Sequence, residues 1–144
     1  MSDQTPEAAA HPACENGRAP AIRQVMMPRD TNANGTIFGG VILSQIDLAA
    51  AIEAHRWHPG RIVTVAMDKV EFKRPVHVGD LVSFYTETVR RGTTSVTVRV
   101  DVWAQRRFGS NQRVAVTQAD VTMVAVDEQG KKTPLANSEP SPLY

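Results

Sequence analysis

The sequence has 144 residues, of which 42% are hydrophobic, and this favours one compact globular domain over a disordered chain. Its formal net charge of +1 gives no bulk attraction to nucleic acid or to a membrane surface, and no apolar run approaches the ~20 residues that cross a bilayer. The only cysteine, Cys14, rules out a disulfide framework and a cysteine-based metal site, and the first 20 residues lack the apolar stretch of a signal peptide, so we expect a soluble cytoplasmic protein.

Both ends of the chain differ in composition from the middle. Residues 1–20 contain few hydrophobic residues and three prolines, which is typical of a flexible arm. Residues 137–144 read Asn-Ser-Glu-Pro-Ser-Pro-Leu-Tyr, and we expect a second flexible tail there. The folded domain is therefore predicted to span residues 21–136.

The first predicted elements are a short strand and a long helix. Apolar residues from Ile22 to Met26 indicate a strand, which Pro28 ends. The turn cluster Asp30-Thr-Asn-Ala-Asn-Gly35 follows. From Phe38 to Ala54 the alanines and leucines favour a helix, and apolar residues on almost every side predict that this helix is buried.

After Gly60 the apolar period changes to that of a strand. The predicted strands cover Arg61–Phe72, Leu81–Val89, Ser95–Trp103 and Arg113–Val126. The links between them, Pro75 to Asp80, Arg91 to Thr94 and Arg106 to Asn111, are short, which predicts antiparallel hairpins. The pattern indicates an α+β domain with one strand, one buried helix and a four-stranded antiparallel meander, and a strongly curved sheet can cover such a helix.

One carboxylate in the predicted helix is chemically unusual. Between Val41 and Ile52 the only polar residues are Ser44, Gln45 and Asp47. A buried carboxylate costs several kcal/mol unless it is paired, and aspartate is a poor helix former. Asp47 is therefore a candidate catalytic residue, and the alternative is a structural aspartate that faces a solvated edge or is held by local hydrogen bonds.

The start of the same helix offers a second candidate site. Gly39 and Gly40 carry no side chains, so their backbone N–H groups can approach a ligand oxygen closely, as an oxyanion hole requires. The alternative is tight packing of the chain at the helix start. Asn32 in the preceding turn cluster is a further candidate, although asparagine also caps turns on its own account.

Taken together, these motifs resemble those of a known family. The similar segments are Met27-Pro-Arg-Asp-Thr-Asn-Ala-Asn-Gly-Thr-Ile-Phe-Gly-Gly40, Ser44-Gln-Ile-Asp47, Ile62-Val-Thr-Val-Ala66, Phe72-Lys-Arg-Pro-Val76, Val78-Gly-Asp80, Gly92-Thr-Thr-Ser95, Val100-Asp-Val-Trp103 and Val124-Ala-Val-Asp127 with Gly130. They cover roughly residues 22 to 135 and resemble YciA-type acyl-CoA thioesterases, a group similar to the brown-fat-inducible and cytosolic acyl-CoA hydrolases.

The resemblance implies the hotdog fold, a curved antiparallel sheet wrapped around one long central helix, and hydrolysis of acyl-CoA to a free acid and CoA. It implies that Asp47 and Asn32 are catalytic, that the Gly40 N–H polarises the thioester carbonyl, and that Gly39 lies against the substrate. It further implies that Asn32 of the loop and Asp47 of the helix in one active site come from different subunits of a homodimer. Such dimers often assemble into a trimer of dimers. Asp47 is then a general base or a nucleophile, and these alternatives stay open.

The resemblance also places one hairpin turn near the CoA channel. CoA carries phosphates, which need cations and N–H donors. The candidate CoA-binding residues are Arg90, Arg91, Gly92, Thr93, Thr94 and Ser95. The alternative is an ordinary charged turn, and for Lys73 and Arg74 the solvated end of a strand is the favoured interpretation.

Two other functions are compatible with the same fold. One is a non-catalytic acyl-CoA-binding sensor, which the presence of both Asn32 and Asp47 disfavours. The other is an enoyl-CoA hydratase or dehydratase with a catalytic histidine. The histidines of this sequence, His11, His55, His58 and His77, lie in neither the turn cluster nor the middle of the helix, which disfavours this function. No spacing indicates a metal site, and we expect no cofactor, because CoA is part of the substrate.

Overall fold

The computed structural model describes residues 18–143, so nearly all of the predicted arm at residues 1–20 lies outside the described residues. The elements are β1 (Ile22–Val25), the short 3₁₀ helix η2 (Pro28–Asp30), α2 (Gly39–Ala54), β2 (Ile62–Asp68), β3 (Leu81–Arg91), β4 (Ser95–Gln105) and β5 (Arg113–Ala125). The helix starts one residue later than predicted, and the predicted strands are all present with shifted ends.

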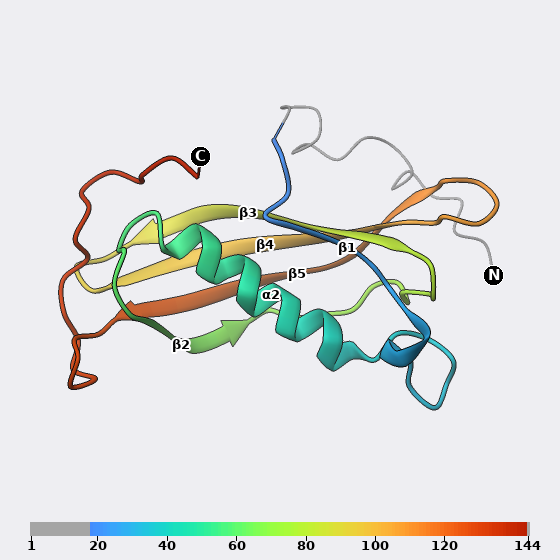
Figure 1. Cartoon of the computed structure of the whole chain (residues 1–144), viewed down its shortest axis with the longest axis horizontal. Helices are drawn as coiled ribbons and strands as arrows, with labels where there is room; N and C mark the ends of the chain where they lie inside the picture. The colour runs from blue at the N-terminus through green and yellow to red at the C-terminus, as the bar shows by residue number, and fades with distance from the viewer. Residues whose placement is uncertain (1–17, 144) are drawn as a thin grey trace.

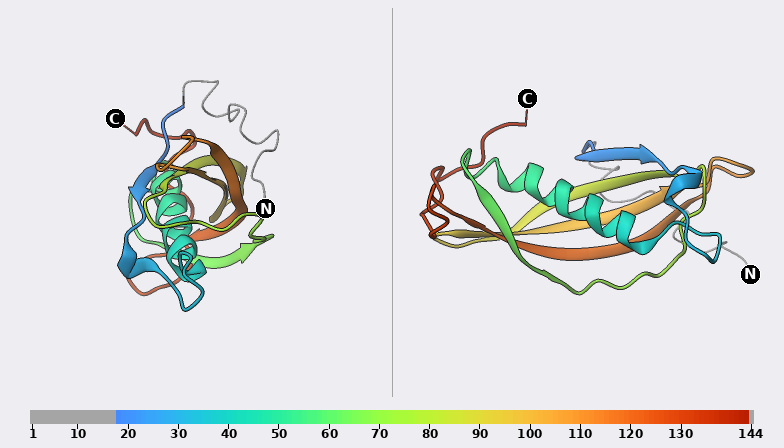
Figure 2. Two further views of the ribbon diagram at one scale, coloured as in Figure 1. Left: turned by 90° about the vertical axis from the view of Figure 1, so that its right-hand side faces the viewer. Right: turned by 60° about the horizontal axis from the view of Figure 1, so that its bottom comes forward.

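The five strands form one antiparallel sheet in the order β1-β3-β4-β5-β2. In Figure 1 the helix α2 crosses the sheet, and the end-on view in Figure 2 shows the sheet curling around it. The predicted α+β architecture, a curved antiparallel sheet around one central helix, is confirmed.

The predicted four-stranded meander is wrong in one strand. Hairpins do join β3 to β4 and β4 to β5, but β2 pairs with β5 and lies at the far edge of the sheet. The strand β2 ends at Asp68, not Phe72, so residues 69–80 form the connection to β3. Twelve residues reach about 40 Å when extended, which is enough to cross from one edge of the sheet to the other. We predicted the end of β2 four residues too late, at Phe72, and this made the connection to β3 look short enough for a hairpin.

The core fills the concave side of the sheet beneath α2. Alternate residues of β4 point toward the helix, and Val96, Val98, Val100 and Val102 are fully or almost fully buried there. They belong to the same core cluster as Ile42 and Ile46 of α2. Burial of each such side chain contributes about 1.5–3 kcal/mol, and this contact fixes the rotation of the helix on the sheet.

The helix is buried on one face only, which corrects the prediction of burial all round. Ile46 and Ala50 face the sheet and are fully buried, whereas Leu48 is 54% exposed and Ile52 is 38% exposed. On the edge strand β2, Val63 and Val65 are also exposed. Apolar residues on this surface explain why the sequence looked like that of an enclosed helix: a single chain leaves the second face uncovered.

A buried polar network holds the C-terminal end of α2. Glu53 is only 4% exposed, and its carboxylate accepts hydrogen bonds from Thr88 Oγ1 at 2.7 Å and from Thr86 Oγ1 at 3.4 Å. Arg56 Nη1 lies 3.2 Å from both carboxylate oxygens. The most buried carboxylate of the helix is therefore Glu53, just beyond the stretch in which Asp47 had been singled out, and it is fully paired.

Candidate active site

Asp47 lies midway along α2, on the side of the helix that faces β2. It is half-buried, and its Oδ1 accepts a hydrogen bond of 2.6 Å from Thr64 Oγ1. Its Oδ2 accepts no hydrogen bond from any described residue. Asp47 is thus less buried than predicted, and the alternative of a locally held carboxylate applies to one of its two oxygens. The other oxygen is available to a ligand.

Thr64 is a site residue that the sequence did not single out. The register of β2 against β5 shifts between Thr64 and Ala66, so Val65 is the extra residue of a β-bulge. Bulges bend a strand and re-aim its side chains, and they are frequent next to active sites. Thr64 contacts Asp47 only because α2 passes over β2, and no local sequence signal reports that crossing.

Gly39 and Gly40 form the first turn of α2. The N-cap residue Phe38 makes no side-chain hydrogen bond to this turn, and within residues 18–143 neither glycine N–H donates a hydrogen bond. A Cβ on Gly40 would lie 2.5 Å from Cε2 of Phe38, so any side chain at this position would displace the exposed ring of Phe38. A Cβ on Gly39 would meet the Phe72 ring at an ordinary 3.7 Å. The turn thus presents two free donors at the positive end of the helix dipole.

Asn32 closes the loop that precedes the helix. Its Oδ1 accepts hydrogen bonds from the backbone N–H of Asn34 at 2.8 Å and of Thr36 at 3.3 Å. The backbone N–H of Asn32 donates to the carbonyl of Thr36 at 2.8 Å. The turn-capping role considered for this asparagine is therefore present, and its amide Nδ2 makes only a long bond of 3.3 Å to Thr36 Oγ1. The amide nitrogen is the part of Asn32 that remains for a ligand.

One chain does not bring the candidate residues together. Gly40 and Asp47 are separated by seven residues of the same helix, which is about 10 Å along its axis. A catalytic base must lie within about 3 Å of its proton, or one water molecule away. Gly40 therefore belongs to the helix start, which follows the loop that contains Asn32, whereas Asp47 and Thr64 lie together near the middle of the helix.

The predicted CoA-binding turn lies at the opposite end of α2 from Gly39, as Figure 1 shows. Arg91 is already engaged there: its Nη2 donates to the carbonyl of Asn137 at 2.9 Å, and its guanidinium lies 5.5 Å from the ring centroid of Trp57. Gly92 N–H closes the turn on the carbonyl of Ser95 at 2.8 Å. The exposed side chain of Arg90 pairs with none of the described residues, so it is the more available cation.

Residues 135–141, which we term the C-terminal clamp, lie against this end of the helix. The carbonyl of Arg56 accepts hydrogen bonds from Ser141 N–H and Asn137 Nδ2, and the carbonyl of Trp57 accepts one from Asn137 N–H. Arg56 Nε in turn donates to the carbonyl of Ser141 at 2.7 Å. These bonds satisfy carbonyls just beyond the helix end. The flexibility predicted for residues 137–144 stays a prediction, but Asn137 and Ser141 of this tail make specific contacts.

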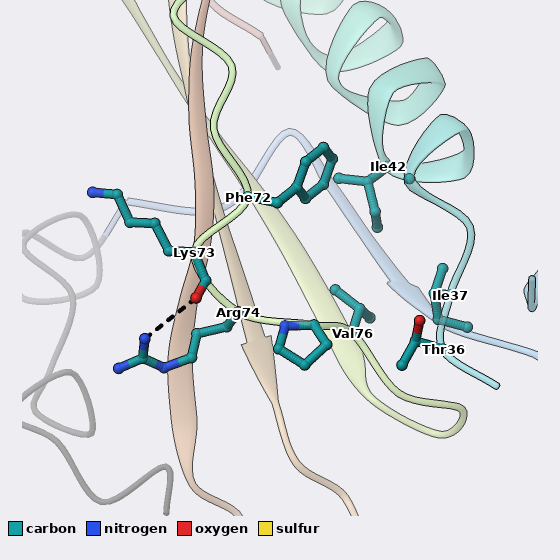
Figure 3. Close-up of a pocket in the computed structure, with 9 residues that line it drawn as sticks. Thr36, Ile37, Ile42, Phe72, Lys73, Arg74 and Val76 are labelled. Carbon is teal, nitrogen blue, oxygen red and sulfur yellow. Dashed lines mark hydrogen bonds between the residues drawn. The ribbon is translucent and has the colours of Figure 1, made fainter. Parts of the chain in front are cut away.

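A cavity lies beside the first turn of α2 (Figure 3). Its volume is about 330 Å³, and its lining comes from the loop before the helix, the helix start and the connection between β2 and β3. The lining residues are Thr36, Ile37, Gly39, Ile42, Phe72, Lys73, Arg74, Pro75 and Val76. The cavity therefore shares Gly39 with the candidate oxyanion site.

Within residues 18–143 the structure offers neither a metal-binding cluster nor a membrane-spanning helix. No group of three or more histidine, cysteine, aspartate or glutamate residues is placed to hold a metal ion. In the same residues, no helix is both long enough and apolar enough to span a bilayer.

The chain is similar to known proteins over most of its length. Residues 34–107 match the family model of the thioesterase superfamily. The acyl-CoA thioester hydrolase YciA of Salmonella typhimurium is 46% identical over 116 residues, which cover 79% of this chain and 87% of that protein. A hexameric hotdog fold thioesterase of Campylobacter jejuni has a TM-score of 0.77 at 50% identity, over 82% of this chain and 90% of that chain. A hexameric broad specificity acyl-coenzyme A thioesterase was solved as an aspartate-to-alanine variant. Its structure has a TM-score of 0.79 at 38% identity, and the match covers 85% of this chain and 89% of that chain.

Proposed function

Because the chain belongs to the YciA family of acyl-CoA thioester hydrolases within the thioesterase superfamily, we propose that it hydrolyses acyl-CoA to a carboxylic acid and CoA through Asp47. The observation that carries the assignment of the residue is the Asp47 carboxylate, which is oriented by Thr64 and keeps one oxygen available. We expect the reaction to need no cofactor and to take place in the cytoplasm.

In the proposed reaction, Asp47 removes a proton from a water molecule, and the water oxygen forms a bond to the thioester carbonyl carbon. The carbonyl oxygen becomes an oxyanion, which accepts a hydrogen bond from the Gly40 N–H. One such donor contributes about 3–4 kcal/mol. The carbon–sulfur bond then breaks, the CoA thiolate takes the proton from Asp47, and the carboxylic acid leaves. Asn32 orients the water or adds a second donor to the oxyanion.

The same residues also permit direct attack by Asp47 on the carbonyl carbon, which would give a mixed anhydride. We favour the general base, because Thr64 holds one carboxylate oxygen in place and leaves the other to accept a proton. Repeated turnover in ¹⁸O-labelled water tests for the nucleophile, because hydrolysis of the mixed anhydride at the Asp47 carbonyl carbon leaves ¹⁸O in that carboxylate, whereas general-base catalysis leaves none. Label in the Asp47 carboxylate, detected by mass spectrometry of its peptide, would show the nucleophile instead.

A homodimer is proposed as the minimum active unit. The strand β2 is the last strand of the sheet, so one of its edges has no partner strand within the described chain. Val63 and Val65 of this strand are exposed, and so are Leu48 and Ile52 on the outer face of α2. An open apolar edge strand is a template for pairing, and a twofold axis would set two such surfaces against each other. A trimer of dimers agrees with the hexamers among the similar structures.

For CoA we propose the Arg90–Ser95 turn, with divided roles. Arg90 offers a phosphate an exposed cation that pairs with none of the described residues, and the backbone N–H groups of Thr93 and Thr94, which donate to none of them either, offer further donors. Arg91 instead holds the turn against Trp57 and Asn137. Replacing Arg90 with glutamine is expected to raise KM for acyl-CoA without lowering kcat.

A thiol-release assay on a panel of acyl-CoAs tests the proposed function. We expect the wild-type protein to release CoA, and Asp47→Ala to lose at least about 100-fold in kcat. Glu128→Ala, which removes an exposed carboxylate from a distant turn, is the matched control and should retain full activity. Wild-type rates for Asp47→Ala would sink the assignment. Binding of acyl-CoA without thiol release would indicate a sensor, and hydration of an enoyl-CoA would indicate a hydratase.

A further inference from the structure

We infer that Glu53, Thr88 and Trp57 are positioning residues for the CoA-binding turn at residues 90–95. The inference rests on the proposed function, which assigns this turn to CoA, and it adds side chains that bind no substrate themselves. Their contacts form one series, from the buried end of α2 through β3 to Arg91 at the start of the turn. The part of the substrate that they affect is therefore its nucleotide half.

The series begins at the buried carboxylate of Glu53, which is ion-paired with Arg56. An ionised carboxylate only accepts hydrogen bonds, so the single hydroxyl proton of Thr88 points to Glu53 Oε2, and the two oxygens lie 2.7 Å apart. The hydroxyl oxygen of Thr88 in turn accepts a bond of 3.0 Å from Trp57 Nε1. Thr88 therefore joins the indole of Trp57 to the buried carboxylate in one defined orientation.

A β-bulge in β3 decides which of two neighbouring arginines meets this indole. The register of β3 against β4 shifts just after Thr88, where Val89 is the extra residue. Bulges re-aim the side chains that follow them. Arg91 consequently lies opposite Val96, a buried residue of β4 that faces the helix, so its side chain is on the helix side of the sheet. Arg90 lies on the other face.

Arg91 connects the fixed indole to the backbone of the turn. Its guanidinium lies 5.5 Å from the ring centroid of Trp57, which is within the range of a cation–π contact. Its Nη1 donates to the carbonyl of Gly92 and its Nη2 to the carbonyl of Asn137, both at 2.9 Å. A displaced indole would therefore displace the turn together with Arg90. A turn that is already held in place loses less conformational freedom when it binds a phosphate.

Two thioesters of the same acyl group test the inference: the acyl-CoA that the wild type hydrolyses fastest, and the matching S-acyl-pantetheine, which lacks the nucleotide and its phosphates. Thr88→Val removes the hydroxyl but keeps the shape of the side chain, and it leaves Glu53 paired with Arg56, so the variant should fold. We expect its KM for acyl-CoA to rise about fivefold with kcat unchanged, as for one lost hydrogen bond. Hydrolysis of the pantetheine thioester should keep its wild-type kcat and KM. Thr88→Ser keeps the hydroxyl and should restore the wild-type KM.

Thr122→Val is the matched control, since it removes a half-buried hydroxyl from β5 that bonds only Thr97 among the described residues. Calorimetry with CoA itself should show binding weakened about fivefold in Thr88→Val, without catalysis. The inference is overturned if Thr88→Val keeps the wild-type KM for acyl-CoA, impairs both thioesters equally, or is matched by Thr88→Ser or Thr122→Val. A wild type with equal KM for both thioesters, or with no hydrolysis of either, would instead contradict the proposed function itself.

Discussion

Mixing two inactive variants should restore activity if the site is shared between chains. Asn32→Ala removes the loop amide and Asp47→Ala removes the base, and each variant alone should lose at least about 100-fold in kcat. The prediction follows from the distance of about 10 Å along α2 between Gly40, which lies with the Asn32 loop, and Asp47. A site that needs both residues must then take them from two subunits.

The expected recovery follows from counting. When the two variants are refolded together in equal amounts, about half of the dimers are mixed, and each mixed dimer has one intact site and one doubly defective site. About one quarter of wild-type activity should therefore return. If both residues act within one chain, every site carries a defect and no activity returns.

A second mixture serves as the control and gives a different ratio. The doubly substituted chain, refolded with an equal amount of wild type, leaves intact sites only in wild-type dimers if the site is shared, which is about one quarter of all sites. With a site inside one chain, about one half of the sites would be intact. Activity per mole of protein, together with mass spectrometry of the dimers, decides between these results. No recovery in the first mixture despite confirmed mixed dimers would refute the shared site.

Three further predictions concern the support of the site and the stability of the domain. Thr64→Val removes the hydroxyl that orients Asp47 and should lower kcat about tenfold with little effect on KM, because hydrogen bonds to charged groups contribute about 1.5–3 kcal/mol; an unchanged kcat would show that Thr64 is not needed. Val65→Asp puts a charge on the open edge of β2 and should shift the protein toward inactive monomers in analytical ultracentrifugation, whereas a stable active dimer would contradict the proposed interface. The hydrogen bond from Arg99 holds the pKa of Asp120 below its ordinary value, so this pair stabilises the fold above that value and loses its contribution as the pH falls. Asp120→Asn should therefore lower the free energy of unfolding by about 1 kcal/mol or less at pH 7, and urea titrations at lower pH should show the difference from wild type shrinking; a constant difference would refute this.

The local features of the fold were predictable from the sequence. The alternating valines of β4 and the short turns on both sides of it identified two hairpins, because both signals depend only on neighbouring residues. The place of β2 was not predictable in this way. Its apolar residues fit either β3 or β5 as a partner, and the choice depends on a connection that runs past the start of the helix to the other edge of the sheet.

The candidate site shows the same division. Asp47 was singled out because a carboxylate is costly in an apolar stretch, and that signal is contained in the sequence itself. Its partner Thr64 and the bulge at Val65 depend on how α2 lies over β2, so no spacing in the sequence indicated them. Glu53 was passed over for a related reason. Its burial results from Thr86 and Thr88 on β3, which lie more than thirty residues away in sequence.

The C-terminal clamp also has a consequence for the order in which the protein folds during synthesis. Asn137 Nδ2 donates to the carbonyl of Arg56, a residue 81 positions earlier in the chain, and Ser141 N–H donates to the same carbonyl. The helix α2 therefore leaves the ribosome well before the residues that bind the carbonyls beyond its end. This end of α2 can take its final form only after β3, β4 and β5 have been synthesised.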